Sequence, residues 1–201
     1  ALSLRFAVLG FDPDQYQKLA FDSAYRYAID LHMCALHALH ARLRGPGSER
    51  LAAVSPGLTE PDNHVEQRVR WPLPTPGRMW REAIGLSRLL PPPDEYCIGA
   101  ILLLRAEAVA DVGLFDDRFF LYAEEADWQR RALERGWHTA EMNDVRALHV
   151  GAGTSADKGR RELLFHAGIE TYMRKWYGRS GWASYRAAAA LGAALRGALL
   201  P

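Results

Sequence analysis

The sequence predicts an α/β protein, because helix and strand signals alternate along the chain. The strongest observation is a continuous apolar run over 97–105, which has the length and pattern of a strand buried on both faces of a sheet. Glycine and proline end the periodic segments on either side of this run. The composition agrees with a folded domain, since 49% of the 201 residues are hydrophobic and 24% are charged.

The predicted elements of the amino-terminal half are short. The apolar run Leu4–Leu9 has the length of a buried strand, whereas 15–28 has features of both a helix and a strand. Apolar residues at helical spacing predict a helix over 33–43, which ends before Gly45. The elements predicted next are a buried strand at 51–54, turns at 56–57 and 61–63, an exposed strand at 65–71, and a surface excursion at 71–93 that contains a helix at 79–90.

The pattern is clearest over 96–155. After the apolar strand at 97–105, a short helix at 106–112 is expected to stop at Gly113. An aromatic-rich loop over 115–122 leads into a helix that opens at Glu124 and stops at Gly136. Two strands are then predicted at 137–142 and 145–150, separated by a turn at Asn143-Asp144.

Charge and cysteine content exclude several classes of protein. With 25 Lys+Arg against 24 Asp+Glu, the formal net charge is +1, so the strong basic field typical of nucleic-acid binding is missing and no nucleic-acid partner is expected. The two cysteines, Cys34 and Cys97, form no CxxC pair, which argues against a zinc finger or a disulfide framework and favours a cytoplasmic location.

Three carboxylates crowd the first turn of the helix predicted to open at Glu124. Glu124, Glu125 and Asp127 can be explained as helix capping, because unpaired backbone N–H groups and the helix dipole favour negative charge there. Their context favours a catalytic role, since an aromatic loop precedes them and His149 ends the last predicted strand, beside a glycine-rich segment. Both interpretations stay open on the residues alone.

The segment 96–155 resembles the family 2 inverting glycosyltransferases of the A-type nucleotide-diphospho-sugar fold, in particular the rhamnosyltransferase-like and galactofuranosyltransferase-like members. The resemblance lies in GAILLLR at 99–105, VGLFD at 112–116, FFLYAEEADW at 119–128, Arg131, GW at 136–137 and His149. These match in order the family's SGA strand, GGFDE turn, FLYxEDxD segment, AGW helix stop and final histidine. The resemblance implies a Rossmann-like mixed sheet flanked by helices.

The same resemblance implies roles for individual residues. Glu125 corresponds to the family's general base, which is usually Asp, so the longer side chain displaces the carboxylate by about 1 Å. Asp127 would orient the site or bind the acceptor, with Glu124 beside it. Gly99, Ala100 and Trp128 would lie on the acceptor side. The implied reaction moves a sugar, with inversion, from a nucleotide-diphospho-sugar to a glycan or lipid-linked saccharide, as in bacterial cell-wall or polysaccharide synthesis.

The resemblance also implies a divalent cation, Mn2+ or Mg2+, on the leaving diphosphate. Asp30, with His32 as an accessory, is the candidate for the acid that ends a strand in family members, and Asp12-Pro13-Asp14 is the runner-up. His149 corresponds to a histidine that helps to hold the cation, although a structural histidine near a strand end is the alternative. The family's uracil- or thymine-binding turns have no counterpart in 1–30, so the fold is expected to be incomplete at its amino terminus.

The expected organisation is a glycosyltransferase-like domain over 1–170, followed by a helical tail over 171–201. Within the domain, 1–56 would be the remnant of the donor and metal side, and 96–155 the acceptor and catalytic side. The tail mixes basic and aromatic residues with an alanine-rich run too short to span a bilayer, so it is expected to lie peripherally at the inner face of the plasma membrane or to pack as a helix. A non-catalytic binding or scaffold protein on a degenerate glycosyltransferase fold is the alternative function.

Overall fold

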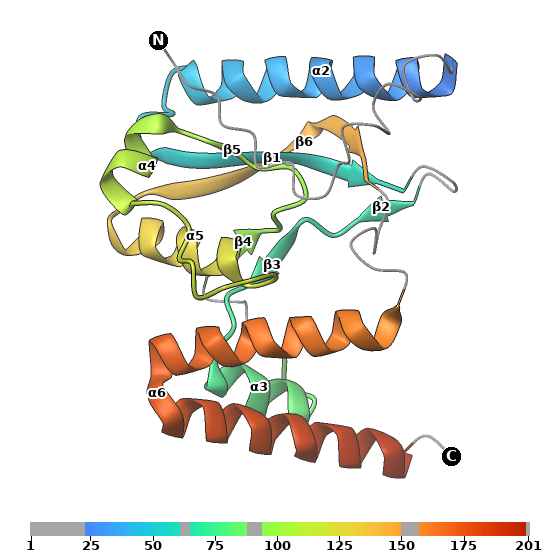
Figure 1. Ribbon diagram of the computed structural model, residues 1–201, viewed down its shortest axis with the longest axis vertical. Coiled ribbons are helices and arrows are strands. Elements are labelled where there is room, and N and C mark those ends of the chain that lie inside the picture. The colour runs from blue at the N-terminus through green and yellow to red at the C-terminus, as the bar shows by residue number, and fades with distance from the viewer. Residues whose placement is uncertain (1–22, 61–64, 88–93, 150–156, 200–201) are drawn as a thin grey trace. The chain divides into compact units, whose positions relative to one another are not determined.

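A computed structural model describes residues 23–60, 65–87, 94–149 and 157–199, with backbone alone for 23–33 and 199. The predicted strand at 4–9, the turn at 61–63 and the aspartates at 12 and 14 lie outside these residues. The elements are, in chain order, α2 (Ser23–Arg44), β1 (Leu51–Thr59), β2 (Glu66–Gln67), β3 (Arg70–Pro72), α3 (Pro76–Ala83), β4 (Glu95–Cys97), β5 (Leu103–Leu104), α4 (Ala106–Val112), α5 (Glu124–Glu134), β6 (His138–Leu148) and α6 (Lys158–Leu199) (Figure 1). The expected combination of helices with a mixed sheet is confirmed.

The chain divides into two compact units, and each is built from three separate segments. The first unit comprises Ala1–Trp71, Tyr96–Leu114 and Trp128–Ala156, and it holds the main sheet. The second unit comprises Pro72–Glu95, Phe115–Asp127 and Asp157–Pro201, and it holds α3, α6 and the aromatic loop before α5.

The main sheet of the first unit is organised around β1. β6 pairs with β1 in parallel along the whole of that strand, and β5 and β2 pair antiparallel with it at Ala53–Val54 and at Leu58–Thr59. Every residue from Leu51 to Leu58 is buried, because helices cover both faces of the sheet. α2 lies on one face and α5 on the other (Figure 1).

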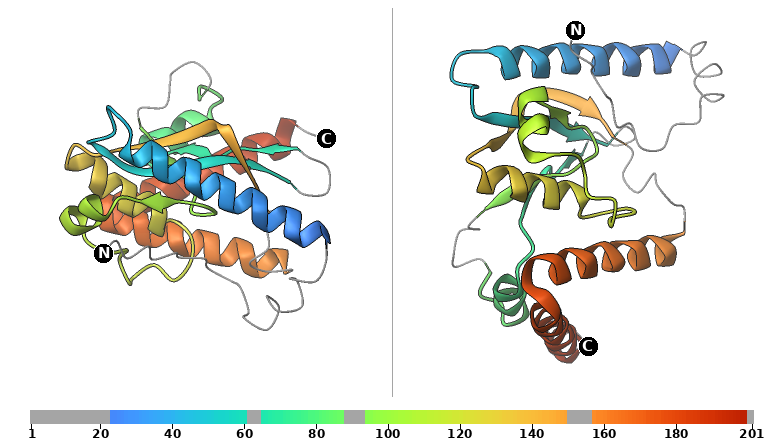
Figure 2. Two further views of the ribbon diagram at one scale, coloured as in Figure 1. Left: turned by 90° about the horizontal axis from the view of Figure 1, so that it is seen from above. Right: turned by 60° about the vertical axis from the view of Figure 1, so that its left-hand side comes forward.

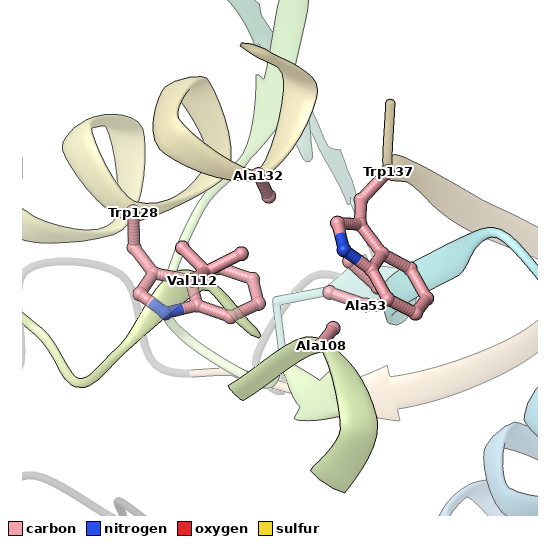
Figure 3. Packing of buried hydrophobic residues seen from close by; sticks show 7 residues of the cluster. Ala53, Ala108, Val112, Trp128, Ala132 and Trp137 are labelled. Carbon is pink, nitrogen blue, oxygen red and sulfur yellow. The ribbon is translucent and has the colours of Figure 1, made fainter. Parts of the chain in front are cut away.

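Two hydrophobic clusters secure these helices to the sheet. On the α2 side, Leu39 and Leu43 pack against Leu51, Val54 and Leu103. On the α5 side, small alanines of β1 and α4 leave room for two tryptophans, as Figure 3 shows. The members of this second cluster are Ala52, Ala53, Ala108, Val112, Trp128, Ala132 and Trp137.

The prediction of one strand over 97–105 is wrong. β4 ends at Cys97, the chain turns at Gly99–Ala100, and β5 contains only Leu103 and Leu104. The Gln129 side chain replaces a neighbouring strand here, because its Nε2 donates to Cys97 O at 2.7 Å and its Oε1 accepts from Cys97 N at 2.8 Å. The run is apolar because it packs against the core while turning.

Two predicted turns also prove to be parts of strands. Pro56 and Gly57 lie inside β1, and Asn143 and Asp144 lie inside β6. The register between these strands shifts where Pro56 pairs with Met142 and Gly57 pairs with Arg146. This bulge accommodates a proline, which has no N–H for the ladder, together with the extra residues of β6. The exposed strand predicted at 65–71 is divided into β2 and β3.

In the second unit α3 packs against α6 (Figure 2). Gly178 has a φ of 67° and breaks α6 into two helical halves, a conformation that glycine adopts without steric cost. In the second half, Gly192 approaches Ala83 of α3 closely and Ala188 is fully buried, while Ser184 accepts a hydrogen bond from Trp80 Nε1 at 3.0 Å. Among the described helices, none is sufficiently long and apolar to cross a bilayer.

Candidate active site

The carboxylates predicted to be functional follow directly on a strained turn. Tyr122 and Ala123 both have a φ of 68°, in the left-handed region that residues with a Cβ adopt at an energetic cost. α5 begins at the next residue, Glu124, as the sequence predicts. Two consecutive residues of this kind persist only where surrounding contacts hold them, and such strain is common at functional sites.

Glu124 and Glu125 are both half-buried, and one carboxylate oxygen of each has no contact with solvent. Burial raises the pKa of Glu124 above its usual value, because removal from water disfavours the charged form. The buried Oε2 of Glu124 accepts no hydrogen bond from the residues that the structure describes. A carboxyl group with a raised pKa and an unsatisfied buried oxygen makes Glu124 a candidate functional residue.

Asp127, one turn further along α5, has a different environment. Its side chain is 0% exposed, and its Oδ1 lies 2.6 Å from Lys175 Nζ and accepts a hydrogen bond from Trp176 Nε1 at 2.9 Å. Lys175 also lies 2.7 Å from Asp116 Oδ2. Because Asp127 points into the protein interior, its position supports the orienting role rather than direct contact with an acceptor.

Asp116 stands at the start of the aromatic loop and completes this charged group. Arg118 Nη2 donates to its Oδ2 at 2.6 Å. This partner, followed by Lys175, holds the pKa of Asp116 well below its usual range. Asp116 is therefore ionised throughout the physiological pH range and pairs with Lys175 as a carboxylate.

The three residues assigned to the acceptor side occupy two kinds of position. Gly99 and Ala100 lie on the turn between β4 and β5, where Gly99 is exposed. Trp128 is 0% exposed in the tryptophan cluster of Figure 3, and its Nε1 donates to Gly113 O at 2.8 Å. The Trp128 side chain thus belongs to the core of the first unit, whereas Gly99 lies at the surface.

His149 follows directly after β6, which ends at Leu148, whereas the sequence predicts it within the end of the last strand. Its Nδ1 lies 2.7 Å from Gln67 Oε1, while Gln67 Nε2 donates to His149 O at 2.8 Å and to Glu60 Oε2. The amide nitrogen of Gln67 donates to two acceptors, which fixes the orientation of the amide. Its oxygen therefore faces Nδ1 of His149, and because an amide oxygen only accepts, Nδ1 must carry the proton. The neutral ring therefore keeps its lone pair on Nε2, the arrangement found in metal-binding histidines.

Burial lowers the pKa of His149 below its usual value, so the ring is neutral near pH 7. This protonation state and tautomer fit a metal ligand. Among the described residues, however, no group of three or more His, Cys, Asp or Glu side chains gathers to hold a metal ion. His149 alone does not form a metal centre.

Asp30, the other candidate ligand, was expected at the end of a strand, and this expectation is wrong. Residues 23–44 form the single helix α2, which contains the helix predicted over 33–43. The helix extends through 30 because 15–28 carried signals of both kinds, and packing of Leu39 and Leu43 on the sheet favours the helical one. The side chains of Asp30 and His32 lie outside the described residues.

The residues that contact His149 and Asp127 were not predicted from the sequence. Gln67 and Glu60 set the tautomer of His149, yet Gln67 is separated from it by 82 positions. Lys175 and Trp176 fix Asp127 from α6, and Trp176 is separated from it by 49 positions. No motif in the sequence links the members of these pairs, because they lie far apart in the chain.

The fold and the acidic segment thus define a mixed α/β protein with a carboxylate site at the start of a helix. The chain is similar to the N-acetylglucosaminyl-diphospho-decaprenol L-rhamnosyltransferases of two Mycobacterium tuberculosis strains, CDC 1551 / Oshkosh and ATCC 25618 / H37Rv. It is 30% identical to each in an alignment 149 residues long, which covers 66% of this chain and 48% of the relative. The chain therefore spans about half the length of the curated relatives that it matches.

No protein-family profile and no solved structure matches the chain. The similarity to curated glycosyltransferases agrees with the family resemblance that the acidic segment indicates. Their name gives the transferred sugar as L-rhamnose and the acceptor as N-acetylglucosaminyl-diphospho-decaprenol.

Proposed function

We propose that this protein is a glycosyltransferase that moves a sugar, with inversion, from a nucleotide-diphospho-sugar to a saccharide linked to a lipid diphosphate. The observation that carries the proposal is the similarity to curated rhamnosyltransferases over 149 residues. The acidic first turn of α5, with a strained approach and half-buried glutamates, supports a catalytic site at this place.

In the proposed reaction Glu125 is the general base. Its carboxylate takes the proton from the acceptor hydroxyl as that oxygen attacks the anomeric carbon from the face opposite the leaving nucleoside diphosphate. Glu124 offers a buried oxygen that takes up a hydrogen bond from the acceptor, and Asp127 orients the turn that carries both glutamates. Gly99, which is exposed, and the half-buried Ala100 take part in acceptor binding in this proposal.

The test combines a binding assay with a transfer assay on the full-length protein. UDP, dTDP and GDP are titrated by calorimetry, and the corresponding nucleotide sugars are then incubated with a polyprenyl-diphospho-N-acetylglucosamine. Tight binding of one nucleotide together with an extended lipid-linked product supports the proposal. Nucleotide binding without product, or acceptor binding alone, would instead favour a non-catalytic binding or scaffold protein.

A divalent cation, Mn2+ or Mg2+, belongs to the same proposal. Asp30 and His149 would hold it, and it would supply positive charge to the leaving diphosphate. EDTA is therefore expected to stop transfer, and added Mn2+ or Mg2+ to restore it. His149→Ala should raise the metal concentration needed for half-maximal rate by about tenfold or more, because one ligand is lost.

The matched control for that variant is His37→Ala, since His37 is exposed on α2 and should leave the metal requirement unchanged. Transfer that persists in EDTA would show that the leaving group is neutralised by other means. An unaltered metal requirement in His149→Ala would assign the Gln67–His149 pair to the fold alone.

Peripheral attachment to a membrane is the last part of the proposal. The second half of α6 carries three exposed arginines, at 179, 186 and 196, and no acidic residue. Leu191 and Leu195 lie one turn apart and are 37% and 39% exposed, beside a face that packs on α3. A basic helix with exposed leucines fits an anionic lipid surface.

Leu191→Gln with Leu195→Gln is expected to weaken binding to vesicles of anionic phospholipid by at least about tenfold, because two apolar side chains no longer enter the interface. Co-sedimentation measures the effect, and Leu163→Gln in the first half of α6 is the control with equal chemistry. Unchanged binding would favour the packed-helix alternative for this segment. If the protein bound neutral vesicles as strongly as anionic ones, the exposed arginines would not contribute to membrane attachment.

A further inference from the structure

The first half of α6 contacts the segment 116–127 through the ammonium group of Lys175, whose side chain is half-buried. Lys175 is 16% exposed, and its Nζ lies 2.6 Å from Asp127 Oδ1 and 2.7 Å from Asp116 Oδ2. Asp116 begins the aromatic loop and Asp127 ends the first turn of α5, so one cation joins the two ends of the segment 116–127. Asp127 requires a positive partner, because its side chain is 0% exposed and a buried charge without one is strongly unfavourable. Asp116 is 14% exposed and pairs with Arg118 as well as with Lys175.

Trp176 adds a second contact from the neighbouring position of the helix. Its Nε1 donates to Asp127 Oδ1, the oxygen that also pairs with Lys175. Lys175 Nζ further lies 5.8 Å from the centroid of the Phe119 ring in the aromatic loop. Two adjacent residues of α6 therefore determine where the Asp127 carboxylate points.

Gly168 provides a third contact, two turns before Lys175 on the same face of α6. A Cβ at this position would collide with the carbonyl oxygen of Tyr122 and would lie 3.0 Å from that of Leu121. Tyr122 is the first of the two left-handed residues that precede Glu124. Only glycine lets the helix approach the strained backbone this closely.

These contacts hold the glutamates from both directions. The strained turn ends at Ala123, and Asp127 lies one helical turn later, so Glu124 and Glu125 stand between two points that α6 fixes. Because displacement of a reacting group by about 1 Å lowers rates strongly, such anchoring matters for catalysis. Neither Lys175 nor Gly168 belongs to the motif that resembles the glycosyltransferases.

We propose that Lys175 is a positioning residue of the transfer site. It acts through Asp127 to fix the helical turn that carries Glu124 and Glu125, while Gly168 lets α6 pack closely on the Tyr122 backbone that precedes them. The transfer itself rests on the function proposed above, whereas the anchoring of the turn does not. Lys175 forms no contact with substrate in this role. It sets the geometry of the base and leaves donor binding unaffected.

The experiment compares Lys175→Met with Arg174→Met in the full-length protein. Arg174 is the matched control because it is the adjacent residue, is exposed, and pairs along α6 with Glu170 at 2.6 Å. Hydrogen–deuterium exchange of the peptide 119–128 reads the anchoring directly, without any need for activity. We expect faster exchange there in Lys175→Met, and no change in Arg174→Met.

Steady-state kinetics provide the second measurement. Lys175→Met should lower kcat at least tenfold, while the KM for the nucleotide sugar changes less than twofold. Partial loss of folded protein does not lower kcat in this way when the concentrations of active enzyme are matched. Combination with Asp127→Asn should cost little more than either change alone, because the two residues act as one unit. Trp176→Phe, which loses only the Nε1–H donor, is the milder variant if Lys175→Met does not fold.

The outcomes separate this proposal from the proposed function. Unchanged exchange over 119–128 would overturn the anchoring, and faster exchange with an unchanged kcat would overturn its importance for transfer. A wild-type protein without transfer activity would overturn the proposed function, while faster exchange in the variant would still support the anchoring. Additive losses in the double variant would show that Lys175 does not act through Asp127.

Discussion

Glu125→Gln is expected to lower the rate of sugar transfer by about 10²- to 10⁴-fold while the dissociation constant of the nucleotide stays nearly unchanged. The amide keeps the size of the side chain but does not accept the proton of the acceptor hydroxyl. The position is half-buried and lies two residues after the strained Tyr122–Ala123 turn, whose geometry is expected to survive a change that keeps the size of the side chain. Single-turnover transfer and nucleotide titration measure the two quantities.

The control is Glu107→Gln, since Glu107 is an exposed acid in the first turn of another helix, α4. It should leave transfer unchanged, which separates base catalysis from the general effect of an acid at a helix amino terminus. Glu124→Gln tests the neighbouring carboxyl. If that variant proved more damaging than Glu125→Gln, the general base would be Glu124, whose pKa burial already raises.

Trp128→Ala is expected to lower the free energy of unfolding by about 3–5 kcal/mol. Its side chain is 0% exposed among the small alanines of β1 and α4 (Figure 3), so truncation leaves a cavity that those residues do not fill. The carbonyl of Gly113 also loses its Nε1–H donor. Equilibrium unfolding in urea measures the loss.

Trp71→Ala is the matched control, because Trp71 is 42% exposed and its truncation should cost less than about 1 kcal/mol. The comparison also decides between the two roles of Trp128. A large loss of transfer with unchanged stability would restore the acceptor-binding role that the resemblance implies, and a large loss of stability supports the core role.

Short-range signals were sufficient for several elements. Helix α4 and its stop at Gly113, the aromatic loop over 115–122, and the start of α5 at Glu124 were all predicted from sequence and are confirmed. Each depends on residues only a few positions apart, such as a glycine with positive φ or acids in a first helical turn. The position of His149 at the end of β6 was predicted for the same reason.

The apolar run at 97–105 shows where such reasoning fails. Its composition correctly predicted burial, but burial does not specify a strand. The backbone of Cys97 pairs with the Gln129 side chain, and the chain then turns at Gly99. A hydrogen-bond partner supplied by a distant side chain leaves no periodic signal in the run itself.

The sequence by itself determined the acidic turn, its aromatic approach and the resemblance that points to sugar transfer, because these are carried by neighbouring residues. Only the tertiary structure decided which acid faces inward. Asp127 is buried because Lys175 and Trp176 of α6 supply its charge partner and hydrogen bond, and His149 keeps its lone pair on Nε2 because its Nδ1 pairs with Gln67. Ion pairs and hydrogen bonds between remote segments form only when folding brings those segments within a few ångströms, so local pattern does not encode them.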